Sequence, residues 1–300
     1  ELKHYGDKFR NKIVFCNCDD PVFFRGGRLD QKKSSKFITY FSVFFEALGL
    51  KKLICLGYKG EGKATAYIYN GDTNRNGIAD ESEWEVRPLE GNGDFRSEES
   101  IAFLKEADIV VTNPPFSLFH EYVDIVAKYG KLCLIIGNMN AITYKEVFPL
   151  IKDSRLFIGC THFNTGMYFT VPDDYEYAES YKSLREIDGV RVMRVPGICW
   201  YTNIDHKKRH RPLLPDLICN KYTGNEQNYP KYDNCDAIDV SSVVKIPYDY
   251  TGVMGVPITF LGKHNPDEFE IIGNINSPRV NGKPVYKRIL IRRTANSLKK

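Results

Sequence analysis

Short apolar runs alternate with amphipathic stretches along the first two-thirds of the chain. Apolar runs with the length and composition of strands cover residues 12–18, 51–57, 84–89, 108–112, 131–137, 156–160 and 198–203. Stretches with apolar residues at helical spacing lie at 37–48, 97–107, 118–129 and 144–152. Strands and helices in this β-α-β order predict an α/β fold with a mostly parallel, doubly wound sheet.

Two of the predicted helices carry signals at their ends. Gly49 follows the first helical stretch and can end it, because glycine readily adopts the left-handed backbone conformation of a helix C-cap. Ser97 can cap the second helix, and Glu98 and Glu99 are favourably placed in its first turn.

The last third of the chain has a different texture, rich in proline, tyrosine and asparagine with short strand-like pieces. Asn281-Gly282 is typical of a tight hairpin turn, and residues 286–293 read as a strand with basic residues at both ends. We therefore place a domain boundary near Asp205, which divides the chain into a larger domain at 1–205 and a smaller one at 206–300.

The formal net charge is +4, but basic residues are unevenly distributed. Residues 279–300 contain eight Lys or Arg and no acidic residue, and a second basic cluster covers 206–211. Such clusters are typical of phosphate contacts with DNA, although a solvated surface with a frayed basic tail fits charge alone equally well. The candidate DNA-binding residues are Lys207, Lys208, Arg209, Arg211, Lys287, Arg288, Arg292 and Arg293.

Other features narrow the class of protein. The chain has no run of about 18 apolar residues, so we expect no membrane partner and no transmembrane helix. It shows no signal peptide, but it begins at Glu1 without methionine, so we expect the natural N-terminus to precede it. Eight scattered cysteines without a CxxC pair indicate free thiols, a cytoplasmic location and no metal site.

The sequence Asn113-Pro114-Pro115-Phe116 is the strongest candidate for chemistry. It follows a predicted strand and precedes a predicted helix, which places it where ligands bind in open α/β sheets. Two prolines fix the backbone and remove two N–H donors, so the Asn113 amide and the Pro114 carbonyl can both act as acceptors. Acceptors for the two hydrogens of an exocyclic amine direct its lone pair toward a methyl sulfonium. Phe116 has a flat ring on which the base that carries this amine can stack.

Gly93-Asp94-Phe95 lies about twenty residues earlier, at the end of the preceding predicted strand. Asp94 can accept a hydrogen bond from the adenine amino group of a cofactor, and Phe95 can pack on the adenine ring. Gly and Asp also favour ordinary turns, so the motif gains its weight from its spacing to Asn113.

Residues Asp72 to Glu83 satisfy the formula of an EF-hand calcium loop. Their flanks at 66–69 and 84–86 read as strands, whereas an EF-hand needs helices on both sides. We therefore interpret this segment as a hairpin tip rich in turn-forming residues, with a structural calcium site as the alternative.

These residues resemble the γ-type amino-methyltransferases of DNA, in which an Asp-Phe pair precedes an [N/D]PP[Y/F] motif. The sequence is more closely similar to the EcoRI-type adenine methyltransferases, whose phrases run along nearly the whole chain. Among them are VFCNCDDP, LGLKKLI, GNGDFRS, IVVTNPPFSLF, IIGNMNAITYKEVF, ICWYTNI and GVMGVPITFL. The resemblance implies a Rossmann-like methyltransferase fold, S-adenosylmethionine as cofactor and a smaller C-terminal region that recognises DNA.

The resemblance also implies a set of site residues. The catalytic residues are Asn113, Pro114, Pro115 and Phe116. Phe163 follows the sixth predicted strand, where it can form the other wall of a target-base pocket with Phe116 or simply belong to the core. The cofactor-binding residues are Cys16, Asn17, Cys18, Asp19, Asp20, Tyr58, Asp94, Phe95 and Asn113. Asp19 and Asp20 can contact the methionine ammonium or simply form a turn and a helix cap.

The sequence departs from the family pattern in three places. CNCDDP replaces the glycine-rich loop after the first strand, and the second strand ends at Tyr58 without the acidic residue that commonly holds the ribose. The motif that closes over the cofactor would precede Glu1. In addition, residues 24–36 are more basic and glycine-rich than the family suggests, so we expect a mobile loop there.

The sequence is best interpreted as a site-specific DNA methyltransferase that methylates N6 of a flipped-out adenine. Double-stranded DNA is the expected partner, and the enzyme would be the modification half of a restriction-modification system with a cognate restriction endonuclease. Two alternatives stay open. One is an N-methyltransferase of RNA bases or protein glutamine, and the other is a catalytically silent methyltransferase fold that only binds DNA.

Overall fold

The computed structural model describes residues 1–19, 22–161, 163–171 and 184–299. Within these residues its main sheet has eight strands, and their order across the sheet differs from their order in the chain. From edge to edge the strands are β6 (Trp84–Pro88), β5 (Thr65–Tyr69), β4 (Lys52–Leu56), β1 (Ile13–Asn17), β7 (Ile109–Thr112), β8 (Leu132–Asn138), β13 (Ile198–Thr202) and β9 (Phe157–Ile158).

The centre of this sheet is parallel, as the sequence predicts. Strands β4, β1, β7 and β8 pair in parallel, while β5 and β13 pair antiparallel with both of their neighbours. The prediction of β-α-β connections throughout is therefore wrong at two places. No α-helix lies between β4 and β6, because β5 connects them as an antiparallel meander with only the 3-10 helix η2 (Glu81–Glu83) before β6. Strand β13 enters the sheet from the opposite direction.

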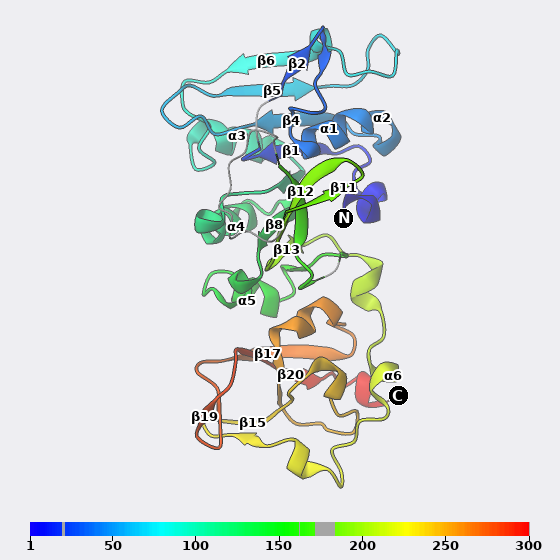
Figure 1. The fold of residues 1–300 in the computed structure, drawn as a ribbon, viewed down its shortest axis with the longest axis vertical. Helices are drawn as coiled ribbons and strands as arrows, with labels where there is room; N and C mark the ends of the chain where they lie inside the picture. Colours follow the sequence, from blue (N-terminus) through cyan, green and yellow to red (C-terminus); the bar gives the residue numbers. More distant parts are fainter. Residues whose placement is uncertain (20–21, 162, 172–183, 300) are drawn as a thin grey trace.

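Helices cover both faces of the sheet, which confirms the doubly wound arrangement (Figure 1). On one face lie α1 (Lys36–Val43) and α2 (Phe45–Leu48), and on the other lie α3 (Glu98–Glu106), α4 (Phe119–Lys128) and α5 (Phe148–Lys152). Alternate residues of the strands feed the two hydrophobic clusters. Phe15 and Ile54 pack with α3 and α4, whereas Val14 and Leu53 pack with α1.

Two of the helix ends follow the chemistry that the sequence predicts. Ser97 caps α3 by accepting a hydrogen bond from the Ser100 N–H, and Gly49 ends α2 with φ +62°. The predicted helix 37–48 is divided at Phe44 into α1 and α2, and the predicted helix 144–152 is shortened to α5.

Two further β structures surround the sheet. Strands β10 (Met167–Thr170), β12 (Val190–Val195) and β11 (Leu184–Ile187) form a small antiparallel sheet between β9 and β13 in the chain. Within the loop expected at 24–36, the first residues form the hairpin of β2 (Phe24–Arg25) and β3 (Arg28–Leu29). Its two-residue turn is Gly26-Gly27, and both residues have positive φ, which suits this tight turn.

The C-terminal region forms a sheet of its own, drawn in yellow to red in Figure 1. Its order is β14 (Lys231–Tyr232), β15 (Cys235–Asp239), β16 (Met254–Pro257), β20 (Arg288–Arg293) and β17 (Phe269–Ile275). The predicted hairpin at Asn281-Gly282 is confirmed as β18 (Arg279–Val280) and β19 (Lys283–Pro284). The short helix α6 (Leu214–Leu217) precedes this sheet.

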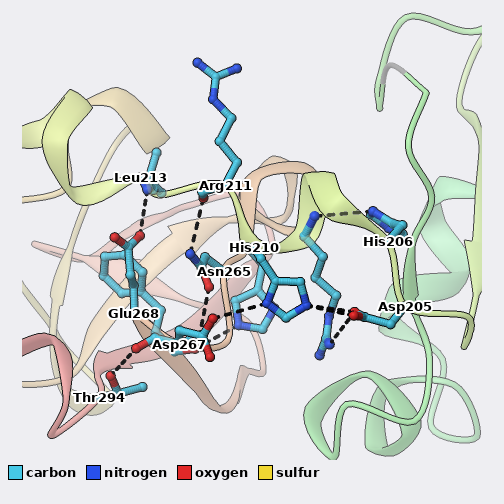
Figure 2. Close-up of polar contacts among 12 residues, drawn as sticks. Asp205, His206, His210, Arg211, Leu213, Asn265, Asp267, Glu268 and Thr294 are labelled. Carbon is cyan, nitrogen blue, oxygen red and sulfur yellow. Dashed lines mark hydrogen bonds and ion pairs between the residues drawn. The ribbon is translucent and has the colours of Figure 1, made fainter. Parts of the chain in front are cut away.

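A connecting segment at 205–213 joins the two regions (Figure 2). The Glu268 carboxylate accepts a hydrogen bond from the Leu213 N–H at 2.6 Å, and the Asn265 side chain donates to the Arg211 carbonyl at 3.3 Å. One hydrophobic cluster includes Ile158 of the main sheet and Phe269 of the C-terminal sheet. The two regions thus pack against each other, and we keep Asp205 as the predicted boundary between them.

Candidate active site

The order of the strands identifies one rim of the sheet as the site. The chain passes from β1 to β4 on one side and later returns to β7 on the other side of β1. A crevice forms where the connections from adjacent parallel strands leave in opposite directions, at the carboxyl ends of those strands. The end of β1 and the turn after it (residues 17–19) and the segment after β7 (residues 113–116) lie there, and the sequence singles them out for the cofactor and the reaction.

The Asn113 side chain sits at the end of the fully buried strand β7. Its Oδ1 atom is buried and has no hydrogen-bond partner among the described residues. A buried acceptor without a partner costs about 1–3 kcal/mol, so its position indicates a donor that binds there. Pro114 is buried and Pro115 exposed, and Phe116 begins the short 3-10 helix η3 (Phe116–Leu118) that leads into α4.

The turn after β1 is made without glycine. Asn17 is buried, and its side-chain oxygen accepts a hydrogen bond from the Cys18 N–H at 2.9 Å. Cys18 adopts φ +61°, a left-handed conformation that is strained for a residue with a side chain. Asp19 is buried and accepts a hydrogen bond from the Ser35 hydroxyl at 3.1 Å, at the cap of α1. Asp20 lies outside the described residues.

Asp94 reaches the same rim because β6 runs in the same direction as β4. Gly93 has φ +79°, and a Cβ atom there would lie 2.5 Å from the Gly57 carbonyl oxygen, so only glycine fits this turn. The Arg96 guanidinium beside Asp94 holds the pKa of that carboxyl below its ordinary value. Asp94 is therefore a carboxylate at neutral pH and can accept hydrogen bonds.

The remaining cofactor candidates differ in exposure. Cys16 is buried within β1, and burial raises the pKa of its thiol, so it lines the core side of the turn as a neutral group. Phe95 is also buried and contacts Tyr122 of α4 edge to face, with ring centroids 5.1 Å apart. Tyr58, after β4, is 61% exposed.

Phe116 and Phe163 pack against different hydrophobic clusters. Phe116 contacts the cluster on the α1 face of the sheet, whereas Phe163 contacts the cluster on the opposite face and lies against Gly262. Both follow strands whose carboxyl ends share the rim. A base pocket that needs both rings stays a prediction.

The comparisons with known proteins concern nearly the whole chain. The family model of the adenine-specific methyltransferase EcoRI matches residues 1–298. The chain belongs to this family. The expected resemblance and the expected adenine-specific methyltransferase activity are thereby confirmed.

Three relatives of this EcoRI family member are similar to it over more than nine-tenths of its length. It is 45% identical to the Type II methyltransferase M.EcoRI of Escherichia coli, over 97% of this chain and 89% of the relative. It is 39% identical to M.MpnI of Mycoplasma pneumoniae, over 93% and 80%. It is 36% identical to M.MgeORF184P of Mycoplasma genitalium, over 98% and 92%. No solved structure matches the chain significantly.

Three of the eight basic residues expected to contact DNA have structural roles in this EcoRI family member. Arg288 is 8% exposed, and its Nε donates to Asp239 at 2.9 Å. Arg293 donates to the carbonyl oxygens of Tyr248 and Ser297. Arg209 lies 4.2 Å over the Phe157 ring with a largely buried side chain. We leave these three out of the DNA interface, because their guanidinium groups already have partners within the fold.

The other basic candidates are exposed. Arg292 pairs with Glu270 at 2.8 Å, and Lys287 donates to the Thr143 hydroxyl at 2.8 Å across the two regions. Lys208 donates to the Cys160 carbonyl at 3.0 Å, beside the rim. Figure 2 shows the Arg211 side chain pointing away from the carboxylates of Asp205, Asp267 and Glu268.

A groove of about 870 Å³ lies between the rim and the C-terminal region. Phe163 of the rim lines it together with Lys208 and Arg211, which the sequence singles out. Sequence reasoning missed the other polar residues, because nothing in the local sequence distinguishes them and only the fold brings them together. They are Asn164, Asp216, Ser241, Ser242, Thr259 and Lys263, so one carboxylate lies among the three basic side chains of the groove.

The segment from Asp72 to Glu83 connects β5 and β6, so the predicted hairpin is confirmed. Its carboxylates hold the loop itself: Asp72 accepts from the Gly77 N–H at 2.6 Å, and Glu83 accepts from the Thr73 N–H at 2.7 Å. Nowhere in the described part of the chain do three His, Cys, Asp or Glu side chains gather as a metal ion would need. The eight cysteines are free thiols, as expected.

The helices of this family member are short. Of those in the described part of the chain, none has both the length and the apolar character needed to cross a membrane.

Proposed function

We propose that this EcoRI family member transfers a methyl group from S-adenosylmethionine to N6 of an adenine flipped out of double-stranded DNA. The observation that carries the proposal is the buried Asn113 Oδ1 without a partner at the switch point of the sheet. An amide oxygen held there can accept a hydrogen from an exocyclic amine. The family supports adenine as the base that carries that amine.

The residues of the rim fit S-adenosylmethionine, which supplies an electrophilic methyl group when bound. The Asp94 carboxylate would accept a hydrogen bond from the cofactor's adenine amino group. The turn at Asn17, Cys18 and Asp19 would hold the methionine end, and Tyr58 would lie beside the ribose. The close approach of Gly93 to the Gly57 carbonyl would hold the loop that carries Asp94 at this rim, because a side chain at position 93 would displace it.

The residues after β7 would act on the target amine. Asn113 Oδ1 and the Pro114 carbonyl would accept its two hydrogens, which directs the nitrogen lone pair toward the methyl group. Because both acceptors are held by a buried strand end and two prolines, they are oriented before the substrate binds. The amine is itself the nucleophile, so this step requires no covalent enzyme intermediate. Phe116, and Phe163 if the two rings come together, would stack on the extrahelical base.

The C-terminal region, residues 206–300, would recognise DNA together with the groove. Lys208, Arg211 and Lys263 supply positive charge to its walls, and the Ser241 and Thr259 hydroxyls can donate to phosphate oxygens. Lys207, Lys287 and Arg292 would extend this surface. The relatives named as Type II methyltransferases support a role as the modification half of a restriction-modification system with a cognate endonuclease.

The test is direct. The purified chain is supplied with labelled S-adenosylmethionine and, in separate reactions, duplex DNA, RNA and protein. DNA from a host expressing the chain is then sequenced by a method that detects N6-methyladenine and its context. We expect label in duplex DNA and one methylated sequence motif. Label confined to RNA or protein, or cofactor binding without any transfer, would overturn the proposal in favour of another amine substrate or a silent fold.

A further inference from the structure

Arg96 is the one residue that contacts both oxygens of the Asp94 carboxylate among the described residues. Its Nε donates to Asp94 Oδ1 at 2.9 Å, and its Nη2 donates to Oδ2 at 2.7 Å. The Arg96 backbone N–H also donates to Oδ1, at 2.8 Å. This is the two-pronged geometry in which an arginine fixes the plane of a carboxylate, and a lysine cannot reproduce it.

The hydrogen bonds to Asp94 leave one position open. A carboxylate has about four lone-pair sites, two on each oxygen. Arg96 fills both sites on Oδ1 and one on Oδ2, so a single acceptor site remains, on Oδ2. Arg96 therefore determines from which side a ligand can donate to this carboxylate.

Arg96 is itself held in place by two further contacts. Its Nη1 donates to Glu121 on α4 at 3.0 Å, and its guanidinium lies 5.2 Å from the centre of the Phe95 ring. The helix α4 follows the turn that carries Asn113, with only the short 3-10 helix η3 between them. The same side chain thus connects the Asp94 turn to the helix that follows the proposed catalytic residues.

We propose that Arg96 is a positioning residue for the cofactor. It orients Asp94 so that the remaining Oδ2 site accepts a hydrogen bond from the adenine amino group of S-adenosylmethionine. The inference rests on the proposed function, because it takes the Asp94 carboxylate as the acceptor for the cofactor. Arg96 touches neither the cofactor nor the target base and acts only through Asp94. Its loss should weaken cofactor binding and spare the reaction of the bound complex.

Calorimetric titration of the full chain with S-adenosylmethionine tests the proposal. We expect Arg96→Gln to raise the dissociation constant of S-adenosylmethionine about tenfold. This is the factor in affinity that corresponds to the free energy of one hydrogen bond to a charged group. Arg96→Lys restores the charge without the fork and should recover only part of the affinity. The matched control is Arg87→Gln. Arg87 also pairs with a carboxylate, Glu85 at 2.7 Å, and lies over an aromatic ring, yet it should leave the affinity unchanged.

Two further measurements distinguish a loss of Asp94 positioning from a general loss of structure. In steady-state methylation, Arg96→Gln should raise the KM for S-adenosylmethionine and leave kcat within about twofold at saturating cofactor. In a double-mutant cycle, Arg96→Gln should add nothing to the effect of Asp94→Asn, because Arg96 acts through that carboxylate. A fall in kcat of the same size as the rise in KM would indicate structural damage and overturn the proposal.

The outcomes also distinguish this inference from the proposed function. If Arg96→Gln binds S-adenosylmethionine as tightly as the wild type or more tightly while Asp94→Asn binds weakly, Arg96 has no positioning role. If Asp94→Asn binds normally, the inference fails, although methylation of DNA adenine by the wild type would still support the proposed function. If the wild type methylates no DNA adenine, the proposed function fails whatever the binding titrations give.

Discussion

Asn113 is the residue whose environment says most about the reaction. The Asn113→Ala variant removes the buried Oδ1 acceptor without touching the Asp94 turn. Because a preorganised polar contact in an active site contributes ~10²–10³ in rate, we expect single-turnover methylation to fall by about that factor. The dissociation constant of S-adenosylmethionine should change little. Quench-flow methylation of duplex DNA and calorimetry measure the two quantities.

Asn140→Ala is the matched control for this variant. Asn140 is exposed, follows β8 at the same rim, and its side chain has no hydrogen bond within the described part of the chain. It should leave turnover unchanged. Methylation by Asn113→Ala at a rate close to that of Asn140→Ala would remove Asn113 from the reaction.

Single residues also show where sequence reasoning reaches its limit. The sequence identifies Asn113 and Asp94 because each motif carries its own chemistry within a few neighbours. It does not separate Arg288 from Lys208, since both are basic residues in basic clusters. The difference depends on Asp239, which is 49 residues away in sequence and pairs with Arg288 inside the C-terminal sheet. Contacts of this kind are decided by the fold.

At the scale of elements, the turn before Asp94 should be sensitive to the smallest side chain. Gly93→Ala places a Cβ 2.5 Å from the Gly57 carbonyl oxygen and 2.9 Å from the Ala64 Cβ. The positive φ costs about 1 kcal/mol, and overpacking adds about 1–3 kcal/mol. Urea unfolding should therefore show a loss of about 2–4 kcal/mol.

Gly77→Ala measures the cost of the positive φ without the cost of overpacking. Gly77 has φ +77°, nearly the value at Gly93, but a Cβ there meets nothing within 4 Å. It should lose only about 1 kcal/mol. Equal losses in the two variants would mean that backbone conformation alone requires glycine at position 93, and that the turn can move away from β4.

The connecting segment should make stability depend on pH. His210, in η5 (Lys207–His210), lies 3.2 Å from Asp267 and 2.9 Å from Asp205, and these carboxylates raise its pKa above 6.5 (Figure 2). The protonated form is therefore favoured in the folded state. This stabilisation is complete below pH 6.5 and is lost as pH rises through the folded pKa.

His210→Gln tests this contribution, since glutamine can bond to carboxylates but does not titrate. From pH 6 to pH 8 the wild type should lose more unfolding free energy than His210→Gln, and the curves should converge at the higher pH. The exposed ring and the screening by solvent keep the difference small. Parallel pH profiles for the two proteins would show that His210 does not link the connecting segment to Asp267.

The central elements could be predicted because their signals are local. The buried runs at β1, β4, β7 and β8 are continuous and apolar, as parallel strands covered on both faces require. The direction of β5 and β13 could not be predicted in this way. A buried strand such as β13 has the same composition whether it runs parallel or antiparallel, and its direction depends on which edge of the sheet its first residue, Ile198, enters.

At the scale of the whole molecule, the proposed reaction site and the basic residues of the groove lie in different regions. The proposed reaction lies at the switch point between β1 and β7, and the basic walls of the groove come from the connecting segment and the C-terminal region. The two regions share a hydrophobic cluster through residues such as Ile158 and Phe269. Binding of DNA in the groove would therefore position the duplex against a rim to which the groove is firmly packed.

The last prediction concerns this groove. Replacing Lys208, Arg211 and Lys263 together by Gln should weaken binding to cognate and random duplexes alike, because phosphate contacts carry no sequence information. Each lost phosphate contact should also reduce the slope of log affinity against log salt by about 0.9. Fluorescence anisotropy at several salt concentrations measures both effects. The control replaces Lys12, Lys105 and Lys128, which change the net charge equally but lie at the opposite rim, before β1 and at the ends of α3 and α4. If both triple variants lost the same affinity, only overall charge would attract the duplex. If only cognate affinity fell, the groove residues would contact bases.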